Sequence, residues 1–289
     1  MDFLYFLQQN HHPIFVFFFE NISLLVNETL IIVVVCFLYW CYNKKIAHKI
    51  AIGFFFSGVV VQSMKVFFRI PRPWILDSRI KPSQEMIETA TGYSFPSGHT
   101  QTATSACYSL LDTFKKKWIL IILLIFPFFM MLSRMYVLVH SPLDVTVSFL
   151  VSAAIALFSL YYLNKNYNKH LQHLLIVMFI FSIIGFAYTV SIVNLNIVTY
   201  ELAEDSIKMM GATAGFTIGC FFETNFLKFE TVKSKKILIL IIGLIFTLAI
   251  KSGLKLVLPV NLFTDYFRYF LTLFWILFVY PLILNKMKR

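Results

Sequence analysis

The sequence predicts an all-α fold, a polytopic membrane helical bundle of about nine transmembrane helices with an N-terminal interfacial segment. Of its 289 residues, 59% are hydrophobic and 13% are charged, and soluble domains usually have close to twice that charged fraction. The apolar residues form blocks of roughly twenty, the length of a helix that crosses a bilayer. Lysines are concentrated between these blocks, as in membrane proteins whose loops fix their orientation.

Residues 1–23 are predicted to lie in the membrane interface rather than to cross the bilayer. They are rich in Phe, Leu and Ile, but a polar run from Gln8 to His12, followed by Pro13, interrupts them. Segments with apolar and polar parts of this kind lie in the plane of the membrane surface.

Nine apolar blocks follow and are predicted to be the spans of a single membrane domain over residues 1–289. Their predicted bounds are 24–42, 50–69, 99–114, 118–139, 143–163, 174–193, 207–222, 237–257 and 266–284.

The connections alternate in charge along the chain. Basic residues follow the first, third, fifth, seventh and ninth spans, and basic loops stay on the cytoplasmic side. This alternation predicts an outer N-terminus and a cytoplasmic C-terminus. The basic residues concerned are Lys44, Lys45, Lys49, Lys115, Lys116, Lys117, Lys165, Lys169, Lys228, Lys233, Lys235, Lys236, Lys286, Lys288 and Arg289.

Charge and cysteine usage exclude some classes of function. The net charge is +11, but the basic residues form short clusters between apolar blocks, so no nucleic-acid partner is predicted. The four cysteines show no Cys-x-x-Cys spacing, which indicates neither a disulfide framework nor a zinc site. They are Cys36, Cys41, Cys107 and Cys220.

The loop over residues 70–98 departs from the charge alternation. It belongs to the predicted outer face, yet Arg72, Arg79 and Lys81 lie in it. An anion-binding role accounts for this, although contact with lipid phosphates would also account for Arg79 and Lys81. Lys65 lies inside the preceding span, where an ionisable side chain indicates a functional site, although a lysine so close to the interface could also extend to the membrane surface.

The segment Pro96–His99 directly precedes a predicted span. Ser97 is a favourable N-cap, and Gly98 permits close approach to the backbone. The free N–H groups at a helix start bind phosphate readily. His99 lies on this first turn; taken alone, it would be interpreted as a polar end residue.

A second helix start has a similar design. Ser141 is a natural cap before Pro142, and Asp144 lies in the first turn, four residues after His140. This offset allows the carboxylate to fix the imidazole tautomer, which leaves the other ring nitrogen free to attack. Arg134 lies near the same predicted membrane level.

Two features farther along the chain receive structural interpretations. Glu201, Glu204 and Asp205 lie in the predicted loop 194–206 and are interpreted as a solvated acidic loop in preference to a substrate contact. Glycines that repeat every four residues predict close helix packing. These are Gly211, Gly215 and Gly219.

Together, three segments resemble the signature of the type 2 phosphatidic acid phosphatase (PAP2) family, which also includes glucose-6-phosphatases and vanadium haloperoxidases. Lys-x6-Arg-Pro corresponds to Lys65–Pro73, Pro-Ser-Gly-His to Pro96–His99, and Ser-Arg-x5-His-x3-Asp to Ser133–Asp144. All three parts are intact and in order. The resemblance implies a catalytic core over residues 50–163, with additional transmembrane helices over 164–289.

The resemblance also implies a role for each residue. His140 would attack phosphorus and form a phosphohistidine, Asp144 would orient it, and His99 would protonate the leaving oxygen. No cluster of His, Asp and Glu has metal-ligand spacing, so neither a metal nor another cofactor is expected. The expected phosphate ligands are Lys65, Arg72, Ser97, Gly98 and Arg134.

The expected function is that of a membrane phosphatase acting on a lipid phosphate or a lipid diphosphate, such as undecaprenyl diphosphate. A lipid phosphotransferase with the same intermediate and a glucose-6-phosphatase-like sugar phosphatase are enzymatic alternatives. A lipid-binding or transport protein is the non-enzymatic one. The expected location is the bacterial inner membrane, with the active site on the extracytoplasmic face.

Overall fold

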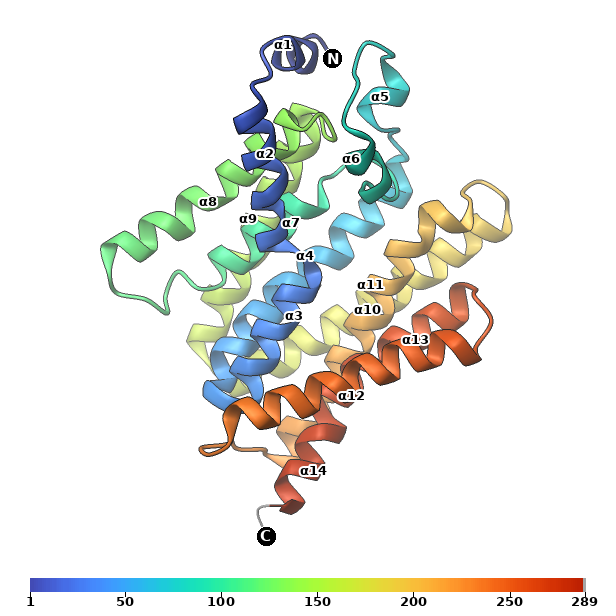
Figure 1. The fold of residues 1–289 in the computed structure, drawn as a ribbon. Coiled ribbons are helices and arrows are strands. Elements are labelled where there is room, and N and C mark those ends of the chain that lie inside the picture. The colour runs from blue at the N-terminus through green and yellow to red at the C-terminus, as the bar shows by residue number, and fades with distance from the viewer. Residues whose placement is uncertain (288–289) are drawn as a thin grey trace.

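The computed structural model describes residues 1–287 and confirms an all-α polytopic bundle; within this range there is no strand (Figure 1). Lys288 and Arg289 lie outside the described residues. The helices are α1 (Asp2–Gln9), α2 (Pro13–Ile22), α3 (Glu28–Phe37), α4 (Lys44–Phe68), α5 (Pro73–Leu76), α6 (Gln84–Thr89), α7 (Gly98–Tyr108), α8 (Lys117–Tyr136), α9 (Pro142–Lys165), α10 (Tyr167–Asn194), α11 (Tyr200–Phe222), α12 (Lys236–Val257), α13 (Leu262–Phe274) and α14 (Tyr280–Met287).

Fewer helices than predicted have the length and composition of a membrane span. Six helical segments in the described residues are long and apolar enough, and a bent pair, Pro13–Val26 with Thr29–Tyr42, would make seven. The predicted count of nine is therefore not confirmed. The break in the bent pair falls at Asn27, whose side chain accepts the Thr29 N–H at 2.8 Å and so starts a new helix.

Two predicted spans account for the difference between nine and seven. The span predicted over 99–114 is wrong in length, because α7 has only 11 residues and is followed by turns. A helix of this length rises about 16 Å, roughly half the thickness of the hydrocarbon core. The other, α11, has 23 residues but carries charged side chains in its first turns.

The helix α7 is short and polar because it is an interior element. Gln101 donates from Nε2 to the Phe54 carbonyl at 3.0 Å and to Ser57 Oγ at 2.7 Å, both on α4. Ser148 Oγ on α9 donates to the Ser97 carbonyl at 2.6 Å. Hydrogen-bond partners on the neighbouring helices therefore replace water for these buried polar groups.

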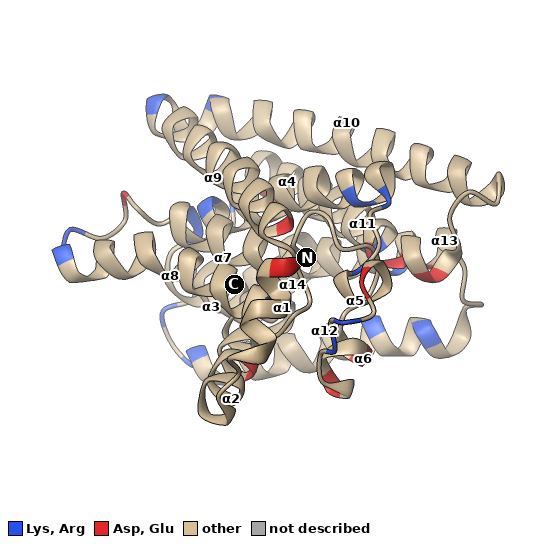
Figure 2. Ribbon diagram, turned by 90° about the horizontal axis from the view of Figure 1, so that it is seen from above, with Lys and Arg blue, Asp and Glu red and all other residues tan. Residues whose placement is uncertain are grey.

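Basic connections far apart in sequence meet at one end of the bundle. Asp112 accepts hydrogen bonds from Lys49 and from Asn164, and Lys44 pairs with Glu223 at 2.8 Å. In Figure 2, Lys and Arg mark the ends of α8, α9 and α10. The long 70–98 connection lies at the opposite end (Figure 1). The basic connections thus gather at one end as the alternation of the loops predicts, whereas the 70–98 connection, which departs from that alternation, lies at the other.

The glycine stripe of α11 packs against α13, as the sequence predicts. A Cβ atom added at Gly211 or Gly215 would overlap the backbone of Tyr266 or Phe270, respectively. This close approach joins the C-terminal helices to α11, which in turn packs against α4 and α10.

Candidate active site

The three sequence motifs meet around one cavity of about 300 Å³. The end of α4, the loop that follows it, the start of α7 and the connection from α8 to α9 each contribute to the lining. Six of the eight residues predicted for the site line this cavity; they are Lys65, Arg72, Gly98, His99, Arg134 and His140. The other two, Ser97 and Asp144, are buried behind it.

The start of α9 fixes Asp144 against His140. Ser141 and Asp144 form a capping box, in which Ser141 N–H donates to Asp144 Oδ2 at 2.7 Å and Ser141 Oγ accepts the Asp144 N–H at 3.3 Å. The same Oδ2 lies 3.5 Å from His140 Nδ1. The capping geometry that begins the helix therefore also places a carboxylate behind the imidazole, as the sequence predicts.

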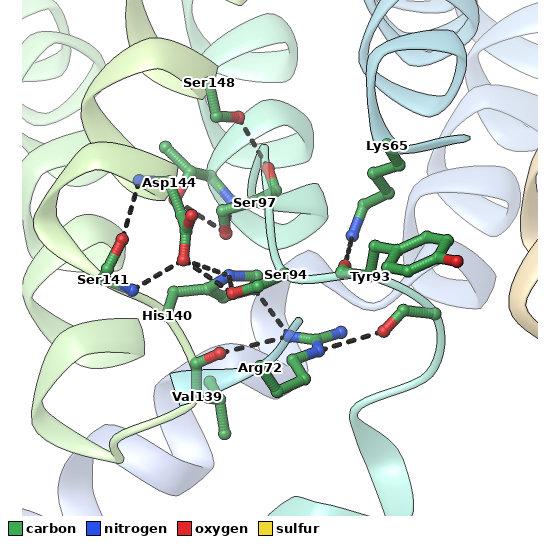
Figure 3. Close-up of polar contacts among 12 residues, drawn as sticks. Lys65, Arg72, Tyr93, Ser94, Ser97, Val139, His140, Ser141, Asp144 and Ser148 are labelled. Carbon is green, nitrogen blue, oxygen red and sulfur yellow. Dashed lines mark hydrogen bonds and ion pairs between the residues drawn. The ribbon is translucent and has the colours of Figure 1, made fainter. Parts of the chain in front are cut away.

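The imidazole of His140 has a different partner on each nitrogen (Figure 3). Nδ1 faces Asp144, whereas Nε2 lies 3.2 Å from Arg72 Nη1. Burial lowers the pKa of His140, and the charge of Arg72 acts in the same direction. A neutral ring with its proton on Nδ1 then presents the lone pair of Nε2 toward the cations.

Backbone carbonyls of the segment 91–93 hold two of the three cations. Lys65 Nζ donates to the Tyr93 carbonyl at 2.6 Å. Arg72 donates from Nη2 to the Thr91 carbonyl at 2.5 Å and from Nε to the Gly92 carbonyl at 3.2 Å. Both side chains are more than nine-tenths buried, so their positions are fixed.

The third cation is held by the N-terminal part of the chain. Arg134 Nη2 donates to the Phe19 carbonyl of α2 at 3.2 Å and to Ser133 Oγ at 2.8 Å. Ser133 Oγ itself donates to the Phe19 carbonyl at 2.7 Å. The segment interpreted from the sequence as interfacial therefore also contacts the site.

The start of α7 forms another part of the cavity wall. Ser97 is the N-cap, and its Oγ lies 3.5 Å from the Thr100 N–H that it accepts. Gly98 and His99 line the cavity, but Ser97 does not. Burial and then the charge of Arg134 lower the pKa of His99. An anion bound among these cations would oppose that shift and favour a protonated His99.

Several polar residues at the site belong to none of the three motifs, and the sequence did not predict them as site residues. Ser94 Oγ donates to Asp144 Oδ2 at 2.6 Å and lies 3.4 Å from His140 Nδ1, so it contacts both members of this pair. Gln62, Asn27, Thr91 and Asp205 line the cavity. Asp205 was interpreted from the sequence as part of a solvated loop; the structure instead places it on a helix, α11, at the cavity wall.

This arrangement is chemically suited to phosphate. Three buried cations and the start of a helix surround a space that a tetrahedral anion would fill, with an imidazole nitrogen facing the same space. Among residues 1–287, no group of three or more His, Cys, Asp and Glu side chains is placed to hold a metal ion.

Comparisons with known proteins identify similar sequences for two parts of the chain. A family model described as the PAP2 superfamily matches residues 46–168. A second, described as the transmembrane extension of PAP2 superfamily phosphatases, matches residues 207–289.

One curated relative and one solved structure are similar to this chain. The relative is an undecaprenyl-diphosphatase of Sulfolobus acidocaldarius, 31% identical over 117 residues, which are 40% of this chain and 55% of that protein. The chain thus aligns with about half the length of that relative. The crystal structure of Aquifex aeolicus LpxE has a TM-score of 0.47 and 27% identity, and it covers 56% of this chain and 94% of that one.

Proposed function

This chain belongs to the PAP2 superfamily, and from this membership we propose that it is a membrane phosphatase that hydrolyses a lipid phosphate or a lipid (polyprenyl) diphosphate. The observation that carries the proposal is the position of His140. Its Nε2 lies 3.2 Å from Arg72 Nη1, and Asp144 lies behind Nδ1. The proposed nucleophile is therefore in contact both with the carboxylate that orients it and with a cation that binds phosphate.

In the proposed first step, Nε2 of His140 attacks phosphorus in line, and the bond from phosphorus to the leaving oxygen breaks. His99 donates a proton to that oxygen. In the second step, water gives its proton to His99 and attacks the phosphohistidine, which releases inorganic phosphate and restores His140.

The proposed mechanism requires no metal ion, because the chain itself supplies positive charge. Phosphoryl transfer depends mainly on positioning and on stabilising the three equatorial oxygens. Lys65, Arg72 and Arg134 are all directed to the cavity, and the N–H groups of Gly98 and His99 belong to a helix start. These groups are suited to that stabilisation.

A lipid substrate is supported by the apolar surroundings of the cavity. A small apolar crevice of about 20 Å³ lies between α3, α4, α11 and the C-terminal segment around Leu273–Leu277, and α3, α4 and α11 also contribute Thr29, Gln62 and Asp205 to the cavity. The crevice residues include Ile31, Ile32, Phe54, Phe55 and Phe216. The helices that carry the cavity therefore include apolar membrane spans, from which a lipid in the bilayer can present its headgroup to the cavity. The named substrate of the curated relative is also a lipid diphosphate.

Within this proposal, residues 50–163 form the catalytic core and 164–289 add transmembrane helices. The site lies on the extracytoplasmic face of a bacterial inner membrane. Transfer of the phosphoryl group to another lipid would use the same intermediate and would differ only in the acceptor. A soluble sugar phosphate would need no hydrocarbon chain.

The proposed function is tested by phosphate release from purified protein in detergent with EDTA. Lipid phosphates, lipid diphosphates and glucose 6-phosphate serve as substrates. We expect release from lipid substrates, and we expect His140→Ala to lower it at least 10³-fold, because the nucleophile is lost. His173→Ala is the control, since His173 is an exposed histidine on α10, away from the cavity.

Three results would contradict parts of this proposal. Full activity in His140→Ala would exclude the phosphohistidine. Release only after addition of Mg²⁺ would exclude a metal-independent reaction. Preference for glucose 6-phosphate over every lipid would exclude the lipid assignment.

A further inference from the structure

Asp205 is a carboxylate on the wall of an otherwise cationic cavity. It lies in the second turn of α11, outside the segments that carry the catalytic motifs. Thr91 Oγ1 donates a hydrogen bond to its Oδ2, and Lys208 Nζ lies 3.6 Å from its Oδ1. Its side chain is still 35% exposed, so it retains acceptor capacity toward the cavity.

The carboxylate is close to the phosphate-binding cations. The carbonyl of Thr91 accepts a hydrogen bond from Arg72, and the hydroxyl of the same residue donates to Asp205. One residue therefore connects the acid to Arg72. A negative charge here repels the phosphate that Arg72 and Lys65 attract, so its presence calls for a favourable interaction with another part of the substrate.

The position of Asp205 is fixed by contacts on both sides of α11. Next to it, Ser206 Oγ donates to the Gln62 carbonyl of α4 at 3.1 Å. On the other side, Tyr200 hydrogen-bonds to Asp265 of α13. Farther along, Gly215 packs directly on the α13 backbone. These contacts fix the helix that carries Asp205, and Thr91 and Lys208 contact its carboxylate, so little conformational entropy is lost when it binds a ligand.

Besides the cations, the two histidines and Asp205, the polar lining of the cavity is uncharged. Asn27, Gln62 and Thr91 line the cavity together with Asp205. These side chains form hydrogen bonds with hydroxyl or amine groups and provide no positive charge for a second phosphate. The cavity thus has cations for one phosphate group and an acceptor-bearing region for uncharged or cationic parts of a headgroup.

We propose that Asp205 accepts a hydrogen bond from a hydroxyl or ammonium group beside the substrate phosphate. The preferred substrate is then a lipid phosphate monoester whose headgroup carries such a donor, rather than a phosphate attached to hydrocarbon or glycerol without one. This inference rests on the proposed phosphatase function, and it gives α11, a helix outside the proposed catalytic core, a role in substrate selection.

The test compares substrates that differ in this donor. 1-Octanoyl lysophosphatidate offers a hydroxyl, sphingosine 1-phosphate offers an ammonium group and a hydroxyl, and dioctanoyl phosphatidate offers neither beside its phosphate; each carries a single phosphate group. We expect the wild type to have the higher kcat/KM on the donor-bearing substrates. In Asp205→Ala we expect that advantage to fall at least tenfold, while kcat/KM on phosphatidate is unchanged or higher because the repulsion is removed.

Two further variants separate recognition from a structural effect. Glu204→Ala is the matched control, because Glu204 also pairs with Lys208, at 2.8 Å, but does not line the cavity. Asp205→Asn keeps an acceptor oxygen and should fall between wild type and Asp205→Ala. Monodispersity in detergent is checked for each variant.

The outcomes are distinguishable. Equal losses on all three substrates, unchanged selectivity in Asp205→Ala, or a wild-type preference for phosphatidate would overturn the inference and leave the phosphatase function intact. A wild type that releases phosphate from no substrate would overturn the proposed function, and the inference with it. Loss on sphingosine 1-phosphate alone would identify the ammonium group as the recognised donor.

Discussion

Asp144 serves both the fold and the proposed chemistry at the scale of a single residue. It accepts the Ser141 N–H in the capping box of α9, and the same oxygen lies 3.5 Å from His140 Nδ1. The two tasks are separable, because an amide oxygen also accepts an N–H but has no charge with which to stabilise the imidazole.

We therefore predict that Asp144→Asn lowers kcat by roughly 10³- to 10⁴-fold, with a melting temperature within a few degrees of wild type. Phosphate release and thermal unfolding in detergent measure the two effects. Asp112→Asn, at the other end of the bundle, is the control. A kcat close to that of the wild type would show that His140 does not depend on this carboxylate.

His99 gives a prediction on pH dependence. Burial and then Arg134 lower its pKa in the free protein, and His99 must be protonated to act as an acid. Activity is thus lost as pH rises through this pKa. A bound phosphate raises the pKa, so the alkaline limb of kcat should lie at higher pH than that of kcat/KM. Both profiles are measured, with the substrate's own titration as a reference; coincident limbs would contradict the proposed role.

The residues that the sequence predicted are those with a local pattern. Arg72, His99, His140 and Asp144 occur at short spacings that a helix start or a motif makes recognisable. Ser94 and Asp205 could not be predicted in this way. Their contacts depend on how α9 and α11 pack against a loop that is distant in sequence.

At the scale of elements, α7 was the helix whose structure was hardest to predict from composition. The block at 99–114 contains Gln101, Thr102 and Thr104, polar side chains whose environment periodicity does not determine. Because α4 and α9 provide hydrogen-bond partners, this segment is a short interior helix instead of a span. The glycine stripe of α11 was predictable, since small residues at a spacing of four permit close packing whatever the partner.

Substitution by alanine should have opposite effects at two glycines, one inside the contact of α11 with α13 and one outside it. Gly215→Ala should destabilise the protein by about 1–3 kcal/mol, because its Cβ would overlap the Phe270 backbone. Gly253→Ala, on α12, meets no atom within 4 Å. It should stabilise by about 0.5–1 kcal/mol, because alanine favours a helix. Thermal unfolding in one detergent compares them; a stable Gly215→Ala would contradict the close packing.

At the scale of the whole molecule, the two ends of the bundle predict an orientation in the membrane. Lys81 lies in the exposed loop near the site, and Lys116 lies in the exposed loop before α8. Three of the four native cysteines are buried, and Cys107 is partly buried. An engineered cysteine at either loop should therefore react far faster than the native thiols.

We predict that a membrane-impermeant maleimide labels Lys81→Cys in intact cells and labels Lys116→Cys only after the membrane is opened. The wild-type chain measures the background from Cys107. The reverse pattern would place the site on the cytoplasmic face.

The class of fold and the gathering of the basic loops were predictable from composition. The number of spans was not, because length and hydropathy alone do not reveal an interior helix.

The carbonyls of the segment 91–93 have a consequence for turnover. Lys65 and Arg72 already donate hydrogen bonds to them, so an entering phosphate replaces one set of acceptors with another. Each new bond joins a cation to an anion and is stronger than the bond to a neutral carbonyl that it replaces, so phosphate binds although both cations already have partners. When inorganic phosphate leaves, these same carbonyls accept the hydrogen bonds of Lys65 and Arg72 again, so both cations keep their positions between turnovers and the empty cavity needs no counter-ion to hold them.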